Sequence, residues 1–308
     1  MKRILISVVL AAICLSSFGQ KQEEKKKFQI KGQPIVTVFA NYHAGIGNAN
    51  KESGFALDRA YLGYQFSLTE KLSGKVVFDM GSTKVSGSDL ERVAYIKNAM
   101  LSWKTGNFTL DFGLIGLEQF NVQEKFWGYR YIMKSFQDEY KFGSSADMGI
   151  LGKYKFTKWL SADITISNGE GYKKLNGDNK YRYAVGATIL PVKNLTIRTY
   201  YDLASKNIEG DETKDQQNLA FFAGYKHELF SIGAEYNQMY NTKFKEDNDQ
   251  SGFSVYSTIK LEDQFNLFGR YDNLGSKDDW SSADGQRILV GIQSVSYTHL
   301  RAHETSAH

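Results

Sequence analysis

The chain has 308 residues, of which 14% are aromatic and 23% charged, and it contains 28 glycines but only two prolines. Its formal net charge of +4 reflects nearly balanced basic and acidic residues, so the composition does not predict nucleic-acid binding. The single cysteine, Cys14, lies near the start of the chain. The rest of the chain therefore forms no disulfide and offers no thiol chemistry.

Both ends of the chain are expected to lie outside the fold. Residues 1–19 join a basic start to an apolar run and a small-residue end, the layout of a secretory signal peptide and too short for a membrane-spanning helix. Residues 20–33 are expected to be a charged periplasmic leader. Residues 294–308 resemble a translated sequencing adapter, so we expect a non-native tail and a lost natural C-terminus. The folded part is predicted to be residues 34–293.

The folded part repeats one unit, in which a strand of alternating polarity, a tight turn and a second such strand follow each other. The first strands are expected over 35–43, 55–68 and 72–81. In the third, Val76 and Phe78 point to one face and Lys75 to the other, the two-residue period of a sheet with one apolar and one polar face. Further strands are predicted around residues 99–103, 108–114, 148–156, 160–166, 183–189, 195–201, 219–225, 230–236, 253–259, 265–271 and 288–292.

The connections between these strands alternate between short and long, which is typical of barrels in the bacterial outer membrane. Aromatic residues gather beside the short turns, as in an interfacial girdle: Phe66, Trp103, Phe108, Phe156, Trp159, Phe230 and Phe265. We therefore predict an all-β fold, an antiparallel transmembrane β-barrel in contact with the lipid of a Gram-negative outer membrane. A soluble β-sandwich is the alternative, but its strands are usually shorter.

A sheet that spans a membrane cannot leave an edge unpaired, because hydrocarbon offers no hydrogen-bond partner. About fourteen strands are visible in the sequence. We therefore expect a barrel of about sixteen strands that is truncated at its C-terminus, so that the chain as it stands should close badly or not at all.

Charged residues on the strand positions opposite the apolar face are predicted to line a pore. They are Arg59, Lys75, Asp79, Asp111, Asp147, Lys153, Asp163, Arg182, Arg198, Asp202, Lys226, Glu235, Arg270, Asp272 and Arg287. Rings of charge inside a pore set which ions remain there. Because the two signs are nearly balanced, we predict weak ion selectivity. The alternative for each residue is a hydrogen bond that keeps the wall rigid.

No catalytic group emerges from the sequence. A hydrolase needs a nucleophile beside a base, whereas His43 and His227 are expected at opposite rims of the barrel. Residues 247–252 imitate the start of a calcium loop, but Thr258 stands where the bidentate glutamate belongs. We therefore predict that the protein is not an enzyme and uses no cofactor or metal.

Four segments carry a family resemblance: FALDRAYLGYQF (55–66), FWGYRYIMKSFQDEY (126–140), SSADMGI (144–150) and SNGEGY (167–172). They resemble the phosphate-selective porin O and P family of Bacteroidetes-like bacteria, over most of residues 32–293. The resemblance implies a sixteen-stranded, usually homotrimeric outer-membrane porin with loops folded into the lumen, and phosphate as its solute.

The residues themselves predict a passive diffusion channel for small hydrophilic solutes or ions. The alternative is a non-conducting structural or ligand-binding barrel. Such a barrel would act through the predicted extracellular loops, residues 45–54, 168–179, 205–217, 241–252 and 273–285.

Residues 113–147 form the longest interval between two predicted strands, far beyond a median connection of about 4–6 residues. They follow the fifth strand, so they belong to the third long loop, which porins commonly fold inward. Aromatic residues there are expected to pack against the wall and charged ones to face the opening. The predicted constriction residues are Phe126, Trp127, Arg130, Lys134, Asp138 and Glu139. A surface cap or a trimer contact is the alternative.

Overall fold

The computed structural model describes residues 31–44, 53–82, 92–174, 179–205, 213–276 and 284–294. The predicted signal peptide, most of the predicted leader and the adapter-like residues after Ser294 lie outside these ranges. These three assignments therefore stay predictions.

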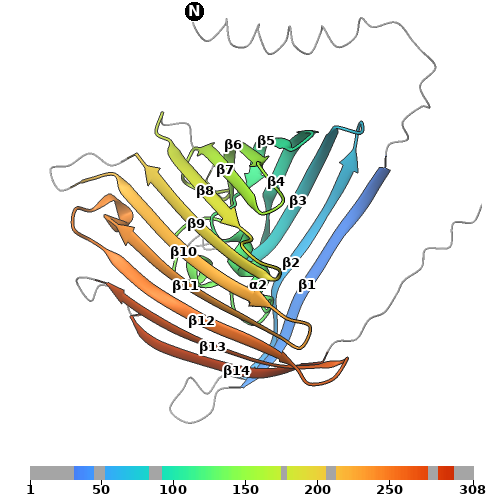
Figure 1. The fold of residues 1–308 in the computed structure, drawn as a ribbon, viewed down its shortest axis with the longest axis vertical. Helices are drawn as coiled ribbons and strands as arrows, with labels where there is room; N and C mark the ends of the chain where they lie inside the picture. Colours follow the sequence, from blue (N-terminus) through green and yellow to red (C-terminus); the bar gives the residue numbers. More distant parts are fainter. Residues whose placement is uncertain are drawn as a thin grey trace, which may run out of the picture.

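Fourteen strands in the described residues form one sheet, and each strand pairs antiparallel with its neighbour in sequence (Figure 1). The strands are β1 (Lys31–Ala44), β2 (Ser53–Ser67), β3 (Leu72–Ser82), β4 (Arg92–Thr105), β5 (Phe108–Gly116), β6 (Ala146–Lys155), β7 (Leu160–Ser167), β8 (Arg182–Ile189), β9 (Leu195–Ala204), β10 (Gln216–Lys226), β11 (Phe230–Tyr240), β12 (Gln250–Lys260), β13 (Phe265–Ser276) and β14 (Gly285–Ser294).

The predicted strands match the observed ones, and only two of them, 55–68 and 148–156, extend one residue beyond the ends of β2 and β6. Larger differences occur at the starts of β1 and β4. Strand β1 begins at Lys31, inside the predicted leader, because Lys31 pairs with Ser67. Strand β4 begins at Arg92, although its predicted pattern starts only at residue 99. The register of β3 and β4 shifts between Val77 and Phe78, and such a bulge interrupts the two-residue period. The alternation of polarity therefore did not predict the first half of β4.

The short connections are tight turns made by local side chains. In two of them, a threonine hydroxyl accepts a hydrogen bond from the backbone N–H three residues later, Thr69 from Leu72 at 2.9 Å and Thr157 from Leu160 at 3.0 Å. Gly106, between β4 and β5, has a φ of 54°, which glycine adopts without steric cost. All these turns follow even-numbered strands, so the predicted alternation of loop length is confirmed.

The convex face of the sheet is apolar and exposed. Ile164 is 63% exposed, and Leu62 and Phe112 are each 50% exposed. Five of the seven predicted girdle aromatics are also exposed, namely Trp103, Phe156, Trp159, Phe230 and Phe265. An apolar band with aromatic ends on the outside of an antiparallel sheet is the lipid-facing surface of an outer-membrane β-barrel. Among the described residues, no helix is long and apolar enough to cross a membrane.

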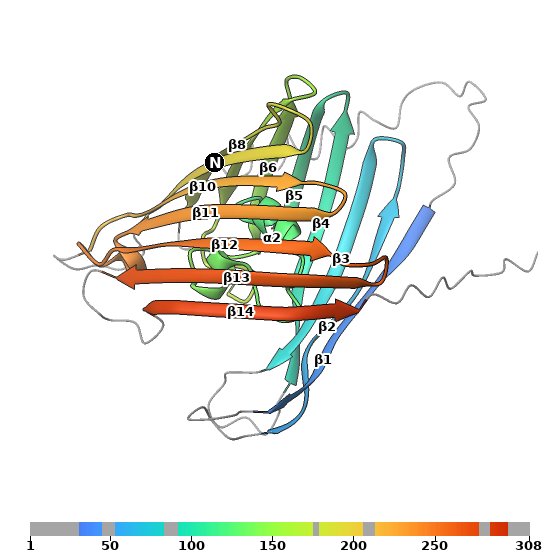
Figure 2. The same ribbon diagram turned by 60° about the horizontal axis from the view of Figure 1, so that its bottom comes forward.

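The sheet curves around a segment that contains helices α2 (Asn121–Trp127) and α3 (Phe136–Glu139), as Figures 1 and 2 show. A short helix, η2 (Thr242–Phe244), lies in the connection between β11 and β12. The largest buried apolar cluster joins residues around α2 to strands β10, β12 and β13. The core of this protein therefore lies inside the curve of the sheet.

Strands β1 and β14 are the two ends of the strand order, and within the described residues they are not paired with each other. Pairing between the two ends is therefore not seen among the described residues, and the expectation that the chain closes badly or not at all stays a prediction. The barrel of sixteen strands stays a prediction.

Candidate functional site

The segment between β5 and β6, residues 117–145, is called the lumen segment here. Its two ends are tied together, because the backbone N–H of Leu117 donates to the carbonyl oxygen of Ser145 at 3.1 Å. The buried Gln119 amide donates to Gln137 Oε1 at 3.0 Å and to the carbonyl oxygen of Phe142 at 3.1 Å. The lumen segment is therefore a unit with its own internal hydrogen bonds, although it is connected to the sheet like a loop.

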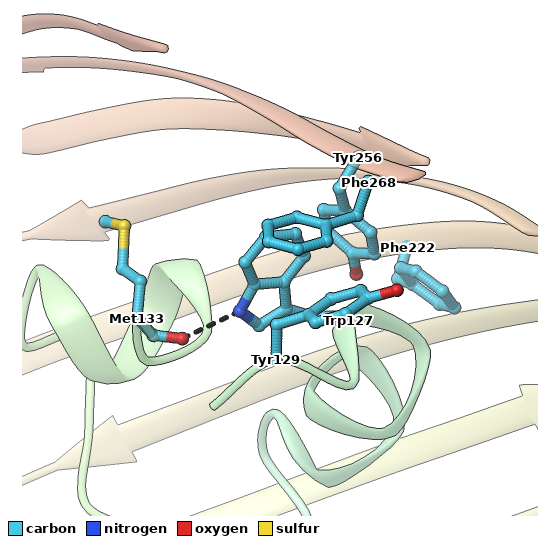
Figure 3. Packing of buried hydrophobic residues seen from close by; sticks show 6 residues of the cluster. All are labelled: Trp127, Tyr129, Met133, Phe222, Tyr256 and Phe268. Atoms are coloured by element: carbon cyan, nitrogen blue, oxygen red, sulfur yellow. Dashed lines mark hydrogen bonds between the residues drawn. The ribbon is translucent and has the colours of Figure 1, made fainter. Parts of the chain in front are cut away.

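Aromatic side chains fasten the lumen segment to the concave face of the sheet (Figure 3). Trp127 is only 1% exposed, and its ring lies 5.8 Å from that of Tyr256 and 6.0 Å from that of Phe268. The indole N–H donates to the carbonyl oxygen of Met133 at 2.7 Å. Tyr129 stacks on Phe268 with ring centroids 4.0 Å apart. These contacts hold the helix α2 region against β12 and β13.

Two glycines of the wall make room for aromatic rings of the lumen segment. A Cβ atom on Gly224 would lie 2.5 Å from Phe126 Cε1, and one on Gly252 would lie 2.6 Å from Phe136 Cζ. Phe136 is fully buried at 0% exposure. The absent side chains therefore let the rings approach the backbone of β10 and β12. The sequence carries no signal for these close approaches of a ring to a glycine, because each glycine stands alone in an ordinary strand pattern.

Arg270 of β13 joins the wall to the lumen segment by a charged contact. Its guanidinium donates two hydrogen bonds to the two carboxylate oxygens of Asp272, at 2.7 and 2.8 Å. A third goes to the carbonyl oxygen of Lys134 at 2.6 Å, and the guanidinium carbon lies 5.0 Å from the Trp127 ring. The buried charge is thus neutralised within the wall while it binds the backbone of the lumen segment.

Tyr140 of the lumen segment contacts the same carboxylate. Its hydroxyl donates to Asp272 Oδ2 at 3.3 Å. Burial, together with the negative charge of Asp272, raises the pKa of Tyr140 to about 12. The neutral phenol is therefore the form that fits this position.

The predicted constriction residues divide into two groups. Phe126 and Trp127 pack against the wall, as the sequence analysis expected. Arg130 forms ion pairs within the lumen segment, with Glu124 and, at 2.6 Å, with Asp138. Three members of the set line a cavity of about 480 Å³ that is shared with residues of β1, β2 and β14, namely Arg130, Lys134 and Glu139.

Most of the charges predicted to line a pore are paired with one another on the concave face. Arg198 makes two hydrogen bonds to Asp163, at 2.7 and 3.0 Å, and Arg182 pairs with Asp202 at 2.7 Å. The other ion pairs from the predicted set are Arg59–Asp79, Lys153–Asp111, Arg270–Asp272 and Arg287–Glu139. For the buried pairs, this arrangement favours the alternative that they keep the wall rigid.

Four of the predicted charges have other surroundings. The Asp147 carboxylate accepts hydrogen bonds from the backbone N–H groups of Met148 and Gly169. Lys226 donates a hydrogen bond to the carbonyl oxygen of Lys125. Glu235 accepts one from the Asn237 amide. Lys75 lines a cavity.

A second inward contact, which the sequence analysis missed, comes from the connection between β7 and β8. The Tyr172 hydroxyl donates to Asp79 Oδ2 of β3 at 2.6 Å, and its backbone N–H donates to the carbonyl oxygen of Ala146 at 3.0 Å. Burial and the bond to Asp79 raise the pKa of Tyr172. Residues 168–174 therefore reach from β7 across to β3. Tyrosine is common in surface loops, so no local pattern indicates this contact.

Two cavities lie between the lumen segment and strands β2 to β9. The mid-lumen cavity has a volume of about 430 Å³, and its lining includes Lys75, Lys97 and Asn98. The turn-side cavity, of about 530 Å³, lies nearer the short turns and is lined in part by Lys104 and Lys155. Because the aromatic contacts occupy the β10 to β13 side, the open space of the lumen lies on the opposite side of the segment.

The two histidines of the described strands and turns contact near neighbours in the chain, His43 with Asn41 and His227 with Phe230. His43 lies at the end of β1, and His227 lies in the turn after β10. The described residues contain no group of three or more histidine, cysteine, aspartate or glutamate residues that could hold a metal ion. In the calcium-like stretch, Asp249 accepts a hydrogen bond from the backbone N–H of Asn241 at 3.0 Å.

No family model matches the chain, and no curated protein matches it. Solved structures with a similar arrangement include a loop-deletion mutant of OmpT, an outer membrane protein of Vibrio cholerae, with 13% identity and a TM-score of 0.45 over 86% of this chain and 98% of that one. OmpF of Salmonella typhi, in complex with daunomycin, has 14% identity and a TM-score of 0.45 over 87% and 97%. OccAB4 of Acinetobacter baumannii has 11% identity and a TM-score of 0.44 over 87% and 89%. At such low identities and TM-scores, these likenesses assign this chain no solute and no site residue.

Proposed function

We propose that the protein is a porin of the Gram-negative outer membrane, a passive diffusion channel for small hydrophilic solutes or ions. The observation that carries the proposal is the contrast between the two faces of one sheet. The convex face is apolar and exposed, whereas the concave face carries charged pairs and polar cavities beside an inward-folded segment. A wall of this kind separates lipid from a water-filled path.

The lumen segment is the constriction of this channel. Its aromatic side is fixed to β10, β12 and β13, and its charged side borders the cavities. Solutes therefore pass between the lumen segment and strands β1 to β9. This arrangement supports the predicted roles of Phe126 and Trp127 as anchors, and of Arg130, Lys134 and Glu139 as residues near the opening. Asp138 is proposed to act there through its ion pair with Arg130.

Selectivity in this channel is weak, because the buried acidic and basic residues of the wall largely neutralise one another. We also propose that the solutes include anions such as phosphate. Lys75 and Lys97 support it, since both line the mid-lumen cavity and neither is in an ion pair with a described carboxylate. We further propose a homotrimer, as the family resemblance implies.

Conductance of the full-length protein in planar lipid bilayers tests the proposal. Ohmic current steps are expected, and deletion of residues 126–141 should enlarge them by removing the constriction. An unchanged step size in the deletion variant would contradict the constriction role. The reversal potential in a salt gradient should be small, and a strong preference for phosphate would contradict weak selectivity.

A non-conducting barrel is the second candidate. It is favoured by one observation, that both the lumen segment and residues 168–174 fold into the concave side and fill part of it. Such a barrel would act through its long loops. A stably inserted protein that gives no current steps, with or without residues 126–141, would support this candidate and contradict the channel.

A further inference from the structure

The mid-lumen and turn-side cavities meet at a single pair of side chains. Of all the residues that line the two cavities, only Glu118 and Lys153 line both. Glu118 belongs to the lumen segment, whereas Lys153 belongs to the wall strand β6. A solute that moves from one cavity to the other therefore passes beside the contact between a group on the segment and a group on the wall.

The geometry of this pair also involves one neighbouring carboxylate. Lys153 Nζ lies 2.9 Å from Asp111 Oδ2 on the adjacent strand β5, and 3.4 Å from Glu118 Oε1. The wall-to-wall contact is thus the shorter one, and the contact across the passage is the longer one. The side chain of Lys153 remains 37% exposed, so water reaches its ammonium group. We call Asp111, Glu118 and Lys153 the neck.

We propose that Glu118 and Lys153 are the specificity-determining residues of this passage. The inference rests on the proposed channel function and adds the place where ions are selected. The neck holds two carboxylates and one ammonium group, which leaves one negative charge in excess. A permeating ion comes within a few ångströms of these groups, where one unit charge changes its local concentration several-fold even in water.

The other charged residues line only one of the two cavities each, which holds for Lys75 and Lys97 in the mid-lumen cavity and for Lys104 and Lys155 in the turn-side cavity. In the turn-side cavity, Arg198 and Asp163 neutralise each other. At the mid-lumen cavity, Glu124 is paired with Arg130. These pairs belong to one side of the passage each, the wall or the segment. Within the described residues, the Glu118–Lys153 pair is the one lining contact that joins both cavities across the gap.

Substitutions that each remove one charge test the inference. Glu118→Gln leaves the neck neutral, and the ratio of K⁺ to Cl⁻ permeability should fall about two- to five-fold. Removal of the ammonium group in Lys153→Gln leaves two excess negative charges, and the ratio should rise by a similar factor. The double variant has the same excess charge as the original protein, so its ratio should return close to the original value.

Lys260→Gln is the matched control, because Lys260 ends β12 near a short turn and lines neither cavity. Reversal potentials of all variants are measured in planar bilayers under one KCl gradient. Opposite shifts in the two single variants, with compensation in the double variant and none in the control, would support the proposal. Unchanged reversal potentials in variants that still conduct would overturn this proposal but leave the proposed channel function standing. Absence of current in every variant, including the original protein, would overturn the proposed function and this inference with it.

Discussion

Replacement of Trp127 by alanine should release part of the lumen segment and enlarge the channel. The indole is 1% exposed and packs among Tyr129, Tyr256 and Phe268. Truncation of a buried tryptophan costs about 3–5 kcal/mol, through lost contacts and the cavity left behind. The carbonyl oxygen of Met133 also loses its indole donor, which adds about 1 kcal/mol.

The cost falls on the docking of the segment, because the hydrogen-bonded strands do not depend on this side chain. Since about 1.4 kcal/mol changes an equilibrium tenfold, a loss of about 4 kcal/mol weakens docking roughly a thousandfold. The residues around α2 should then leave the wall for part of the time. Helix α3 should remain, because Phe136, Tyr140 and Phe142 pack in a separate cluster with Met239 and Leu274.

Single-channel recording should therefore show larger or noisier current steps in the Trp127→Ala variant. Limited proteolysis should also cut residues 120–134 faster. Trp159→Ala is the matched control, because Trp159 is 52% exposed in the turn between β6 and β7 and does not touch the lumen segment. If Trp127→Ala conducts like the original protein while circular dichroism shows an intact barrel, the aromatic contacts do not hold the constriction, and the reasoning is refuted.

Three further predictions concern other contacts of the lumen segment. Arg270→Met should lower the thermal unfolding temperature in detergent, since loss of the guanidinium leaves a buried carboxylate without its cation, a change that costs about 3–5 kcal/mol; an unchanged temperature would contradict this role. Gly224→Val should displace the Phe126 ring from the backbone of β10 and raise the conductance. Gly275→Val should leave the conductance unchanged, because an added Cβ there meets nothing within 4 Å. The pKa of Tyr140 is raised to about 12 by burial and a nearby carboxylate, so its stabilising contribution should be complete below about pH 10, the ordinary value, and be lost as the pH rises toward 12. Other tyrosines, such as Tyr172, also have a raised pKa, so ultraviolet absorbance titration should show one late-titrating tyrosine fewer in Tyr140→Phe than in the original protein. Equal titration curves for the two proteins would contradict the assignment.

Most of each strand, the order of the strands and their two faces could be predicted from the residue pattern alone. A two-residue period is a property of consecutive residues, and a membrane favours apolar side chains at the outward positions of a strand. The outward face therefore carries exposed apolar residues such as Ile164 and Leu62, as predicted. The inward face carries charged residues such as the paired Arg198 and Asp163. The inward position of residues 117–145 could also be expected, from their length and aromatic content. Where the period broke, at the bulge between β3 and β4, the prediction lost the first half of a strand.

The tertiary structure alone decided which side of the lumen the segment occupies. Trp127 meets Tyr256 and Phe268 only because the sheet curves and carries β12 and β13 around to it. Contacts between residues more than a hundred positions apart leave no periodic pattern in the sequence. The approach of Phe126 to Gly224 and the pairing of Glu118 with Lys153 could not be read from the chain either, because each joins residues of two elements that only the folded sheet brings together. Local hydrogen bonding and the membrane fix the wall, whereas the curvature of the sheet in space fixes the passage.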